Sequence, residues 1–466
     1  MRLASLTRRA FLAAGAAGVA TAWLARPGSA ADDDPYAFAP GSPIAWRNWA
    51  GNQVCRPAAR LAPPSEGELA DALAAATGPV RPAGTGHSFS ALVPSDGTLV
   101  FADLLAGVIA SDPAQREAEV WAGTRLHALG PALAAVGQAM PNLSDIDYQT
   151  LGGALATSTH GTGGTLGSLS SAVAGLRIAT VRGELVDCDA ARRPELFAAA
   201  RVSLGALGVV TRARLRNRER HRLVEHTSIV PLADVLEDVE RWRREHLHFE
   251  LMPFPHSAMT LLVTTDPAGD DAPETTADDP YAIETLETLY RATRALPWIG
   301  GALFDLALRA QPSGVRAGDS YAVLSHPRIV RFREMEYTVP AEAGPACLRE
   351  VLRTIHERDI DVHWPLEYRY VRRDDAWLSM FHERDGASIS IHQSAALDHR
   401  PYFDAIEPIF WKYEGRPHWG KLHTLDAPRL AALYPRFRDF LAVRRELDPD
   451  GRLLNPHLRT LFGTAG

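Results

Sequence analysis

The sequence predicts an α+β fold, and three features of the chain support this prediction. Between residues 63 and 218, short strand-type runs alternate with helical runs, as in an α/β unit. Between residues 221 and 413, strand-type runs mix with helices in a pattern typical of an antiparallel α+β domain. With 466 residues, of which 46% are hydrophobic and 23% charged, the chain can bury a large core and form two or three domains.

The first part of the chain contains clear helix and hairpin signals. Ser65 and Glu68 form a capping-box pattern that opens a helix rich in alanine and leucine. Arg182 and Gly183 separate two strand-type runs and therefore predict a β-hairpin. Helices are expected at residues 65–76, 125–136 and 194–200. Strands are expected at residues 79–82, 98–102, 119–122, 176–181 and 184–188.

The second part combines longer strands with two helices and one polar loop. Arginines alternate with apolar residues in the run 212–222, which fits a half-solvated strand and linker better than a binding patch. Residues 266–279 almost lack aliphatic side chains and predict a mobile surface loop, without the ligand spacing of a calcium-binding EF-hand. Strands are expected at residues 249–252, 259–264, 329–339, 366–371 and 389–392, and helices at 282–295 and 341–357.

Charge and cysteine content exclude several classes of partner. The formal net charge is -7 and the pI is about 6.2, whereas nucleic acids and anionic membranes favour a basic surface. We therefore expect a small uncharged or anionic metabolite and no nucleic acid. The three cysteines, Cys55, Cys188 and Cys347, contain no C-x-x-C pair, so neither a disulfide framework nor a thiolate metal site is indicated. Their number allows one disulfide.

The N-terminus resembles a twin-arginine export signal. Arg8 and Arg9 precede an apolar, alanine-rich run that ends near Ala25 and is followed by small residues. This run is shorter than the roughly 17–25 residues that an ordinary spanning helix needs, and cleavage is expected near Ala30. We therefore expect a signal peptide at residues 1–30 and an extracellular or periplasmic protein, with the membrane met only during export. An uncleaved helix or anchor is the alternative.

Three glycine-rich segments carry the chemistry of the first part. Residues 81–88 form a tight turn after a strand, where backbone N–H groups can approach a phosphate closely. Residues 147–164 interleave glycines with Ser and Thr hydroxyls, and apolar side chains at near-helical spacing predict a short packed turn at their start. Residues 203–211 would let main-chain groups bond a planar ring.

In this order and spacing, the three segments resemble the PCMH-type FAD-binding domain of the vanillyl-alcohol-oxidase superfamily. Residues 46–53, Trp-Arg-Asn-Trp-Ala-Gly-Asn-Gln, add a resemblance to its aldonolactone and alditol oxidase branch. The resemblance covers residues 44–218 and resumes near the C-terminus. It implies a two-subdomain FAD-binding domain at residues 31–218, an antiparallel-sheet substrate (cap) domain at 219–415, and a C-terminal segment at 416–466 that returns to the FAD domain.

The resemblance implies FAD as the cofactor and His87 as its covalent attachment point. The histidine of the family's G-x-G-H-S pattern commonly bonds the 8α carbon of the flavin, and a neutral imidazole is a competent nucleophile near neutral pH. The alternative is a histidine that only hydrogen-bonds near a phosphate. No cysteine lies in this loop, so a second, cysteinyl bond is not expected. The implied cofactor-binding residues are Ala83, Gly84, Thr85, Gly86, His87, Ser88, Thr150, Gly153, Thr157, Ser158, Thr159, His160, Gly161, Gly208 and Val210.

On the substrate side, Glu367 and Arg369 alternate on an expected strand and therefore share a face. Spacing alone fits an ordinary solvated pair. The resemblance instead implies that Glu367 accepts hydrogen bonds from substrate hydroxyls while Arg369 lies by the flavin. It also implies pocket roles for His392, Ser394 and Lys421, with Thr150, Glu367, Arg369, Ser394 and Lys421 contacting the substrate. Either Lys421 or His392 would accept the hydroxyl proton.

One position departs from the family pattern. Oxidases of this branch usually show Asn-Leu-Gly before the second segment, whereas this chain has Ser144 after Asn142 and Leu143. A small residue there is associated with oxygen access to the reduced flavin. Dioxygen is the expected electron acceptor, and a dehydrogenase that uses another acceptor stays open.

The sequence therefore predicts an FAD-dependent oxidase of the CH–OH group of a sugar-derived lactone, such as D-arabinono-1,4-lactone, without a metal. An alditol oxidase is the alternative within the family. The alternative outside enzymes is an exported sugar-binding module that has lost redox function, and the presence of Glu367, Arg369 and Lys421 weighs against it.

Overall fold

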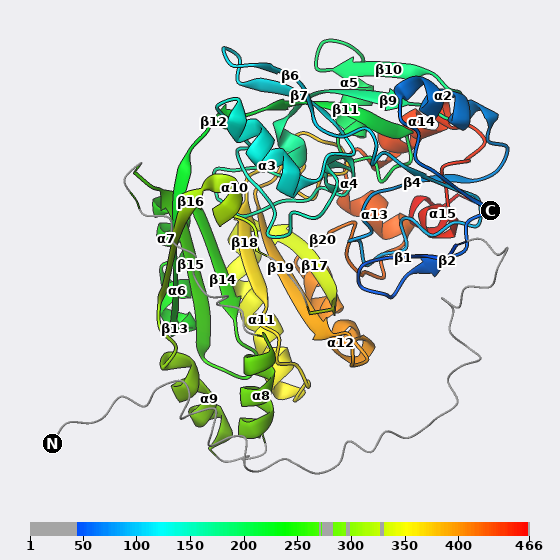
Figure 1. Cartoon of the computed structure of the whole chain (residues 1–466). Coiled ribbons are helices and arrows are strands. Elements are labelled where there is room, and N and C mark those ends of the chain that lie inside the picture. Colours follow the sequence, from blue (N-terminus) through cyan, green and yellow to red (C-terminus); the bar gives the residue numbers. More distant parts are fainter. Residues whose placement is uncertain (1–43, 270–271, 273–282, 295–298, 327–329, 465–466) are drawn as a thin grey trace. The chain divides into compact units, whose positions relative to one another are not determined.

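The computed structural model describes residues 44–269, 272, 283–294, 299–326 and 330–464, which belong to one compact unit. The expected signal peptide at residues 1–30 lies outside these residues, as does most of the expected loop 266–279. Figure 1 shows the described part as two groups of sheets with the helices packed around them.

A three-stranded parallel sheet holds the first glycine-rich turn. Its order is β3 (Ala59–Leu61), β5 (Thr98–Phe101), β4 (Val80–Ala83). Helix α2 (Glu66–Ala75) precedes β4, and the Ser65 side chain accepts the Glu68 N–H and donates to the Glu68 carboxylate, which confirms the predicted helix start. Because β4 ends at Ala83, residues 84–88 begin at the carboxyl end of a buried strand.

A five-stranded antiparallel sheet lies beside it. Its order is β10 (Leu185–Asp189), β9 (Val173–Ala179), β11 (Val209–Arg216), β7 (Glu117–Trp121), β6 (Val108–Asp112). The predicted hairpin is present, but its turn spans residues 180–184 rather than two residues, because the Thr180 N–H bonds the Glu184 carbonyl. Strand β6 was not predicted, since most of this edge strand is exposed and its sequence, VIASD, lacks alternation.

The arginine-rich run is a strand and linker, as predicted. Strand β11 alternates buried apolar residues with Arg212, Arg214 and Arg216, and the run continues through β12 (Arg218–Glu219) to β13 (Arg222–Pro231). Arg212 pairs with buried Glu66. These arginines therefore join elements of the fold.

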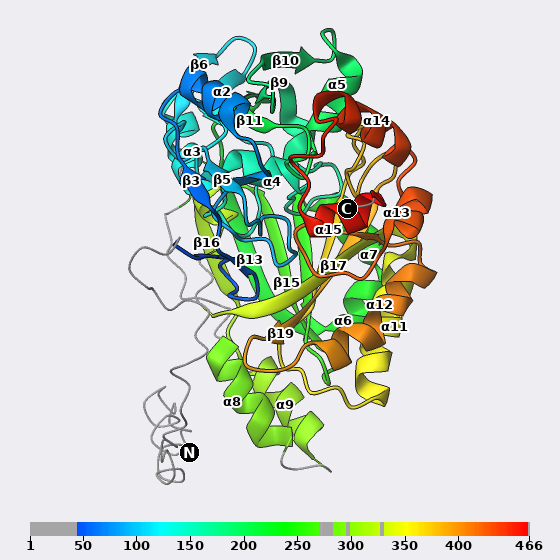
Figure 2. The same cartoon turned by 90° about the vertical axis from the view of Figure 1, so that its right-hand side faces the viewer.

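The second part of the chain is an eight-stranded antiparallel sheet. Figures 1 and 2 show α11 (Gly344–Glu357) and α12 (Arg400–Lys412) along one face, and α8 (Ile283–Arg294) and α9 (Gly300–Arg309) at one end. The strands of this sheet, in spatial order, are β16 (Gly314–Asp319), β13, β15 (Met259–Pro267), β14 (His248–Pro253), β18 (Glu367–Val371), β19 (Gly386–Ser394), β17 (Phe332–Pro340) and β20 (Arg416–Pro417). The central strands β18, β19 and β17 are buried almost throughout. Charged side chains on these strands are therefore expected to pair with other protein groups and not with water.

The remaining elements cover these sheets or connect them. The other helices are α3 (Leu126–Ala135), α4 (Leu151–Ala156), α5 (Pro194–Ala200), α6 (Leu232–Glu237), α7 (Val239–Glu245), α10 (Ser320–Val323), α13 (Ala427–Leu433), α14 (Phe437–Leu447) and α15 (Pro456–Phe462). The short strands and 3-10 helices are β1 (Trp46–Arg47), β2 (Val54–Cys55), β8 (Gln138–Ala139), η1 (Leu169–Ala172) and η2 (Ala341–Ala343).

The C-terminal segment returns to the first part of the chain (Figure 2). The fully buried Arg81 side chain donates to the carbonyls of Leu92, Leu204, Gly205 and Leu453. A single guanidinium thus connects β4, the third glycine-rich segment and the chain end.

Cys55, Cys188 and Cys347 are all free thiols, so the disulfide that their number allows does not form. Among the helices of the described ranges, none has the length and apolar content needed to cross a membrane.

Candidate active site

A large cavity opens between the glycine-rich segments and the eight-stranded sheet, with about 1610 Å³ of empty space that includes a part open to solvent. One end is lined by Ala83 to Ser88, by residues of α4, and by residues 203–205 and 208–210. The other end is lined by charged side chains of β17, β18 and β19. The fold thus joins the three glycine-rich segments to the predicted substrate strand.

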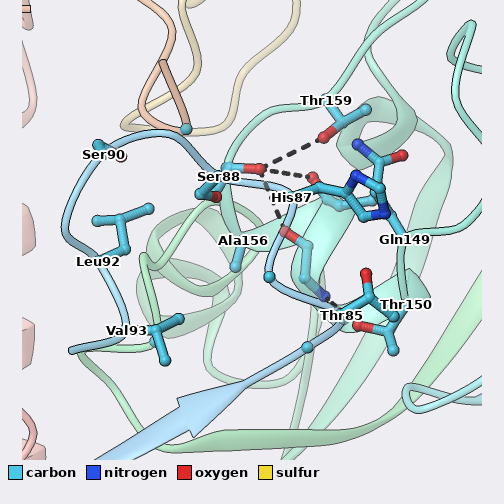
Figure 3. Close-up of a pocket in the computed structure, with 18 of the residues that line it drawn as sticks. Thr85, His87, Ser88, Ser90, Leu92, Val93, Gln149, Thr150, Ala156 and Thr159 are labelled. Atoms are coloured by element: carbon cyan, nitrogen blue, oxygen red, sulfur yellow. Dashed lines mark hydrogen bonds between the residues drawn. The ribbon is translucent and has the colours of Figure 1, made fainter. Parts of the chain in front are cut away.

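The turn after β4 packs closely against the N-terminus of α4. Thr150 caps α4 by accepting the Gly153 N–H, which confirms the predicted packed turn. A Cβ at Gly84 would lie 2.6 Å from the Thr150 hydroxyl, and Gly86 has a φ of +75°, so both positions favour glycine. Figure 3 shows His87 and Ser88 on this turn, facing Gln149, Thr150 and Thr159 of the second segment.

The third segment closes the same end of the cavity. Gly208 has a φ of +135°, and a Cβ there would lie 2.5 Å from the Ala179 carbonyl. Its backbone therefore lies directly against β9, and the neighbouring Val209 and Val210 line the cavity.

His87 lies at the junction of the two ends. Its ring stacks on Trp49 at 5.7 Å and faces Tyr148 at 6.5 Å between ring centroids. Its Nδ1 is buried and has no hydrogen-bond partner. Burial lowers the pKa of His87 to about 4, assisted by the charges of Lys421 and Arg125. The ring is therefore neutral at physiological pH and has one nitrogen free for a bond to a ligand.

Glu367 and Arg369 share a face of β18 and form an ion pair, as the alternation predicted. The Arg369 Nη2 lies 3.1 Å from a Glu367 carboxylate oxygen and 3.4 Å from Glu336 of β17. Burial disfavours the arginine charge, but the surrounding carboxylates outweigh this and raise the pKa of Arg369. The guanidinium is thus a fixed positive charge in the cavity wall.

Lys421 and His392 meet at a second carboxylate. Lys421 donates to Glu334 of β17, and the His392 Nε2 lies 3.6 Å from the other oxygen of Glu334. Sequence reasoning placed Lys421 and His392 together but did not find Glu334.

A buried triad joins the flavin-side loop to the sheet. The His160 Nε2 lies 2.6 Å from a Glu336 oxygen, and its Nδ1 lies 2.8 Å from the Gly161 carbonyl. His418 lies beside them, with burial lowering its pKa to about 3 and its Nδ1 accepting the Gly420 N–H. His160 is thus a cavity wall residue tied to the substrate strands.

Comparison with known proteins assigns the chain to a family. The D-arabinono-1,4-lactone oxidase family matches residues 213–461, and the FAD-binding domain family matches residues 57–189. The L-gulono-1,4-lactone dehydrogenase of Mycobacterium tuberculosis is 36% identical, over 91% of this chain and 100% of that protein. The chain belongs to the D-arabinono-1,4-lactone oxidase family.

Two further proteins are similar to this family member. The L-gulonolactone oxidase of Mus musculus is 28% identical, over 90% of this chain and 98% of that protein. The solved cholesterol oxidase of Brevibacterium sterolicum has a TM-score of 0.73 at 16% identity, over 92% of this chain and all of that one, which shows the shared fold. The prediction of an FAD-dependent oxidoreductase in the vanillyl-alcohol-oxidase superfamily is therefore confirmed, and the binding-module alternative is not favoured.

The cavity fits FAD. Gly84, Gly86 and Gly208 line one end of the cavity without side chains, and a dinucleotide phosphate needs such close approach of main-chain groups. The unpartnered Nδ1 of the neutral His87 ring lines the same cavity, so it would be able to hold the flavin.

Three residues that the sequence placed in the site do not line this cavity. Ser158 points to Ser379, with 3.3 Å between the hydroxyl oxygens. Gly161 packs against the Leu143 carbonyl and Asn142, and lines a smaller neighbouring pocket. Ser394 accepts the N–H of Ala396 at the end of β19. All the other implied cofactor and substrate residues line the cavity.

Sequence reasoning missed the two carboxylates of β17. Glu334 and Glu336 alternate with Met335 and Tyr337 in a strand that was predicted, and both carboxylates are buried. Two glutamates on one face of a predicted buried strand indicate a charged site, because buried carboxylates need partners of opposite charge.

Two sets of side chains in this wall have donor spacings that would suit a cation. The first set is His160, Glu336 and His418. The second set is Glu334, Glu367 and His392. However, each set already meets a protein cation, since Arg369 contacts Glu336 and Glu367 while Lys421 contacts Glu334. The positive charge that these carboxylates require is therefore supplied by the chain itself.

Proposed function

We propose that this protein oxidises a carbinol group of a sugar-derived 1,4-lactone by hydride transfer to FAD, with dioxygen as the electron acceptor. The observation that carries the proposal is the charged wall of Glu334, Glu336, Glu367, Arg369 and Lys421, which faces the same cavity as His87. Such a wall suits a small polyhydroxylated substrate. The family match supports a lactone.

In this proposal, Glu367 accepts hydrogen bonds from substrate hydroxyls and orients the C–H bond toward the flavin. Arg369 provides fixed positive charge where negative charge develops. FAD supplies the hydride acceptor. Thr150 lies at the junction of the α4 cap and the cavity, within reach of both cofactor and substrate.

We further propose that FAD is attached through His87. The neutral ring and its unpartnered Nδ1 support this attachment. Unfolding should leave yellow fluorescence on the protein band in a denaturing gel, and the His87→Ala variant should release it. The matched control is His127→Ala, because His127 lies 5.4 Å from the Tyr148 ring but does not line the cavity. Release of flavin from the unmodified protein would exclude the bond.

The substrate class is tested by anaerobic flavin bleaching. We expect aldonolactones to bleach the flavin at least about tenfold faster than linear polyols, because a preorganised wall discriminates between ring and chain hydroxyl positions. Faster bleaching by polyols would instead indicate an alditol oxidase.

Ser144 supports a second candidate, a dehydrogenase. Its buried hydroxyl lines the cavity and donates to the Ile146 carbonyl at 2.7 Å, so it occupies space where oxidases of the branch usually have glycine. The M. tuberculosis relative is named a dehydrogenase. Stopped-flow reoxidation of the reduced protein in air decides between the two, and Ser144→Gly should raise that rate if the side chain hinders oxygen.

We also retain the proposal of twin-arginine export, which rests on Arg8, Arg9 and the following apolar run. Replacement of both arginines by lysine should keep the protein in the cytoplasm. Equal secretion of the lysine variant would argue against this route.

A further inference from the structure

Glu334 holds Lys421 from the interior of the protein. The Glu334 side chain is 3% exposed and the Lys421 side chain 19%, so the carboxylate is the more deeply buried partner of this ion pair. The Lys421 Nζ also lies 5.1 Å from the centroid of the Phe89 ring, which favours a cation at this position. The amine therefore has a fixed anionic partner and a fixed place.

His392 contacts the same carboxylate from the neighbouring strand. Glu334 and His392 are directly opposite in the register of β17 and β19. The His392 Nδ1 lies 3.0 Å from the Pro365 carbonyl and must donate to it, which turns Nε2 toward Glu334 and Glu367. A neutral ring would point a lone pair at two carboxylates, whereas a protonated ring donates to them.

The pKa shifts of Glu334 and His392 agree with that geometry. Burial works to raise the pKa of Glu334, but the charges of Lys421 and His392 outweigh it and hold the pKa at about 2. Burial likewise works to lower the pKa of His392, and the Glu334 and Glu367 carboxylates reverse this and raise it. The carboxylate is thus ionised, and its charge favours the protonated form of His392.

We propose that Glu334 is a positioning residue that keeps Lys421 as an ammonium group, so that Lys421 serves the reaction as a hydrogen-bond donor and a positive charge and not as a base. The same carboxylate holds His392 as a donor. Neither of the two groups that the sequence offered as the base then takes the hydroxyl proton. As the hydride leaves for FAD, that proton passes to the Glu367 carboxylate, which accepts the hydrogen bond of the substrate hydroxyl and lines the same cavity. This inference deepens the proposed function and rests on it for the chemical role of Lys421.

Other charged groups also surround the pair and enter any pH dependence. They are Glu336 of β17, Glu367 and Arg369 of β18, His418 next to Lys421, and His87 of the turn after β4. Without Glu334, the partly buried Lys421 would lose its counter-charge. Its proton would then be lost more readily.

The lysine content of the chain allows a direct test. The chain has two lysines, Lys412 and Lys421, so protein labelled with ¹³C at the lysine ε-carbon gives two side-chain signals. In the unmodified holoprotein, we expect the Lys421 signal to keep its ammonium position from about pH 6 to about pH 9. This range ends below the ordinary pKa of a lysine side chain. A Lys421 signal at the free-amine position near neutral pH overturns the proposal. This measurement needs no substrate, so it remains decisive if the proposed substrate is wrong.

The Glu334→Gln variant removes the counter-charge and keeps the shape. We expect its Lys421 signal to move to the free-amine position within that pH range. The rate of flavin reduction should fall about tenfold at pH 6 and about 100-fold or more at pH 9, since loss of one oriented donor costs this order of rate. Glu334→Asp keeps the negative charge and should restore most of the rate of flavin reduction at pH 6. A loss that is equal at every pH, with an unmoved Lys421 signal, would mean a merely structural role and overturn the proposal.

Lys412 provides the matched control. It donates to Glu350 at 2.7 Å on the exposed side of the protein, which is the same pair of groups without the cavity. Glu350→Gln should shift only the Lys412 signal and leave flavin reduction unchanged. If Glu334→Gln does not fold, the titration of the unmodified protein and of Glu334→Asp decides the question.

Discussion

At the residue scale, the site depends on charges whose partners are fixed by the protein. Arg369 illustrates this, because it has carboxylates of two strands within 3.4 Å and little exposure. A buried guanidinium in such a pair is costly to remove, since each carboxylate is then left without its counter-charge.

Replacement of Arg369 by Met should therefore impair the chemical step more than cofactor binding. We expect the rate of flavin reduction to fall about 100- to 1000-fold, the cost of losing a preorganised charge. Rapid-mixing absorbance at the flavin band measures this. The Arg353→Met variant, on the exposed face of α11, is the control and should be unaffected. A rate within about threefold of the unmodified protein would remove Arg369 from the reaction.

His87 should make flavin attachment nearly independent of pH over the physiological range. With a pKa of about 4, the ring is neutral above that value, so attachment in apoprotein supplied with FAD should be flat from about pH 5 to pH 8. Below about pH 4 protonation removes the nucleophile, and the rate should fall about tenfold per pH unit. Fluorescence of denatured samples taken over time measures the rate. A midpoint near the usual histidine value would contradict the predicted environment of His87.

At the element scale, the register of the strands decides which side chains meet in the site. Glu334 lies opposite His392 in β17 and β19, and Glu367 lies opposite Ser390 in β18 and β19. A shift of one residue would turn each of these side chains to the other face of the sheet. The sequence predicts all three strands, and alternation in β18 places Glu367 and Arg369 on one face. The neighbours of these strands were not predicted, because the sheet order joins strands that are far apart in the chain.

Arg81 links strand β4 to the C-terminal segment, and its loss should destabilise the protein. Burial lowers the pKa of Arg81 to about 9, opposed by Asp448. The Arg81→Met variant leaves the carbonyls of Leu204, Gly205 and Leu453 without this donor, and we expect a loss of about 3–5 kcal/mol of unfolding free energy. The Leu92 carbonyl still accepts from Asn455. Urea unfolding at fixed FAD content measures it. A change below about 0.5 kcal/mol, as expected for a surface arginine such as Arg353, would show that the carbonyls find other donors.

At the scale of the whole molecule, the active site needs the chain end. Lys421 lies beyond the eight-stranded sheet in sequence, and Asn455 donates to carbonyls of residues 91, 92 and 94, just after the His87 turn. Truncation after residue 446 would remove these contacts while leaving the sheets intact.

We expect the truncated protein to lose FAD binding as well as stability. The expected result is little soluble holoprotein and less than about a tenth of the flavin content of the full chain, since several buried donors lose their partners. The absorbance ratio of flavin to protein measures this. Truncation after Gly463, beyond the last described helix, is the control. Full flavin content in the shorter protein would mean that the first part of the chain binds FAD by itself.

The sequence by itself determined the fold class, the cofactor and the family. Local, contiguous segments encode these, because a phosphate turn requires glycines at adjacent positions and a strand face requires alternating residues. Tertiary structure alone decided that Ser158 and Ser394 turn away from the cavity and that Glu334 pairs with Lys421. The physical reason is that a buried charge must meet its counter-charge, and residues 87 positions apart meet only through sheet order and register.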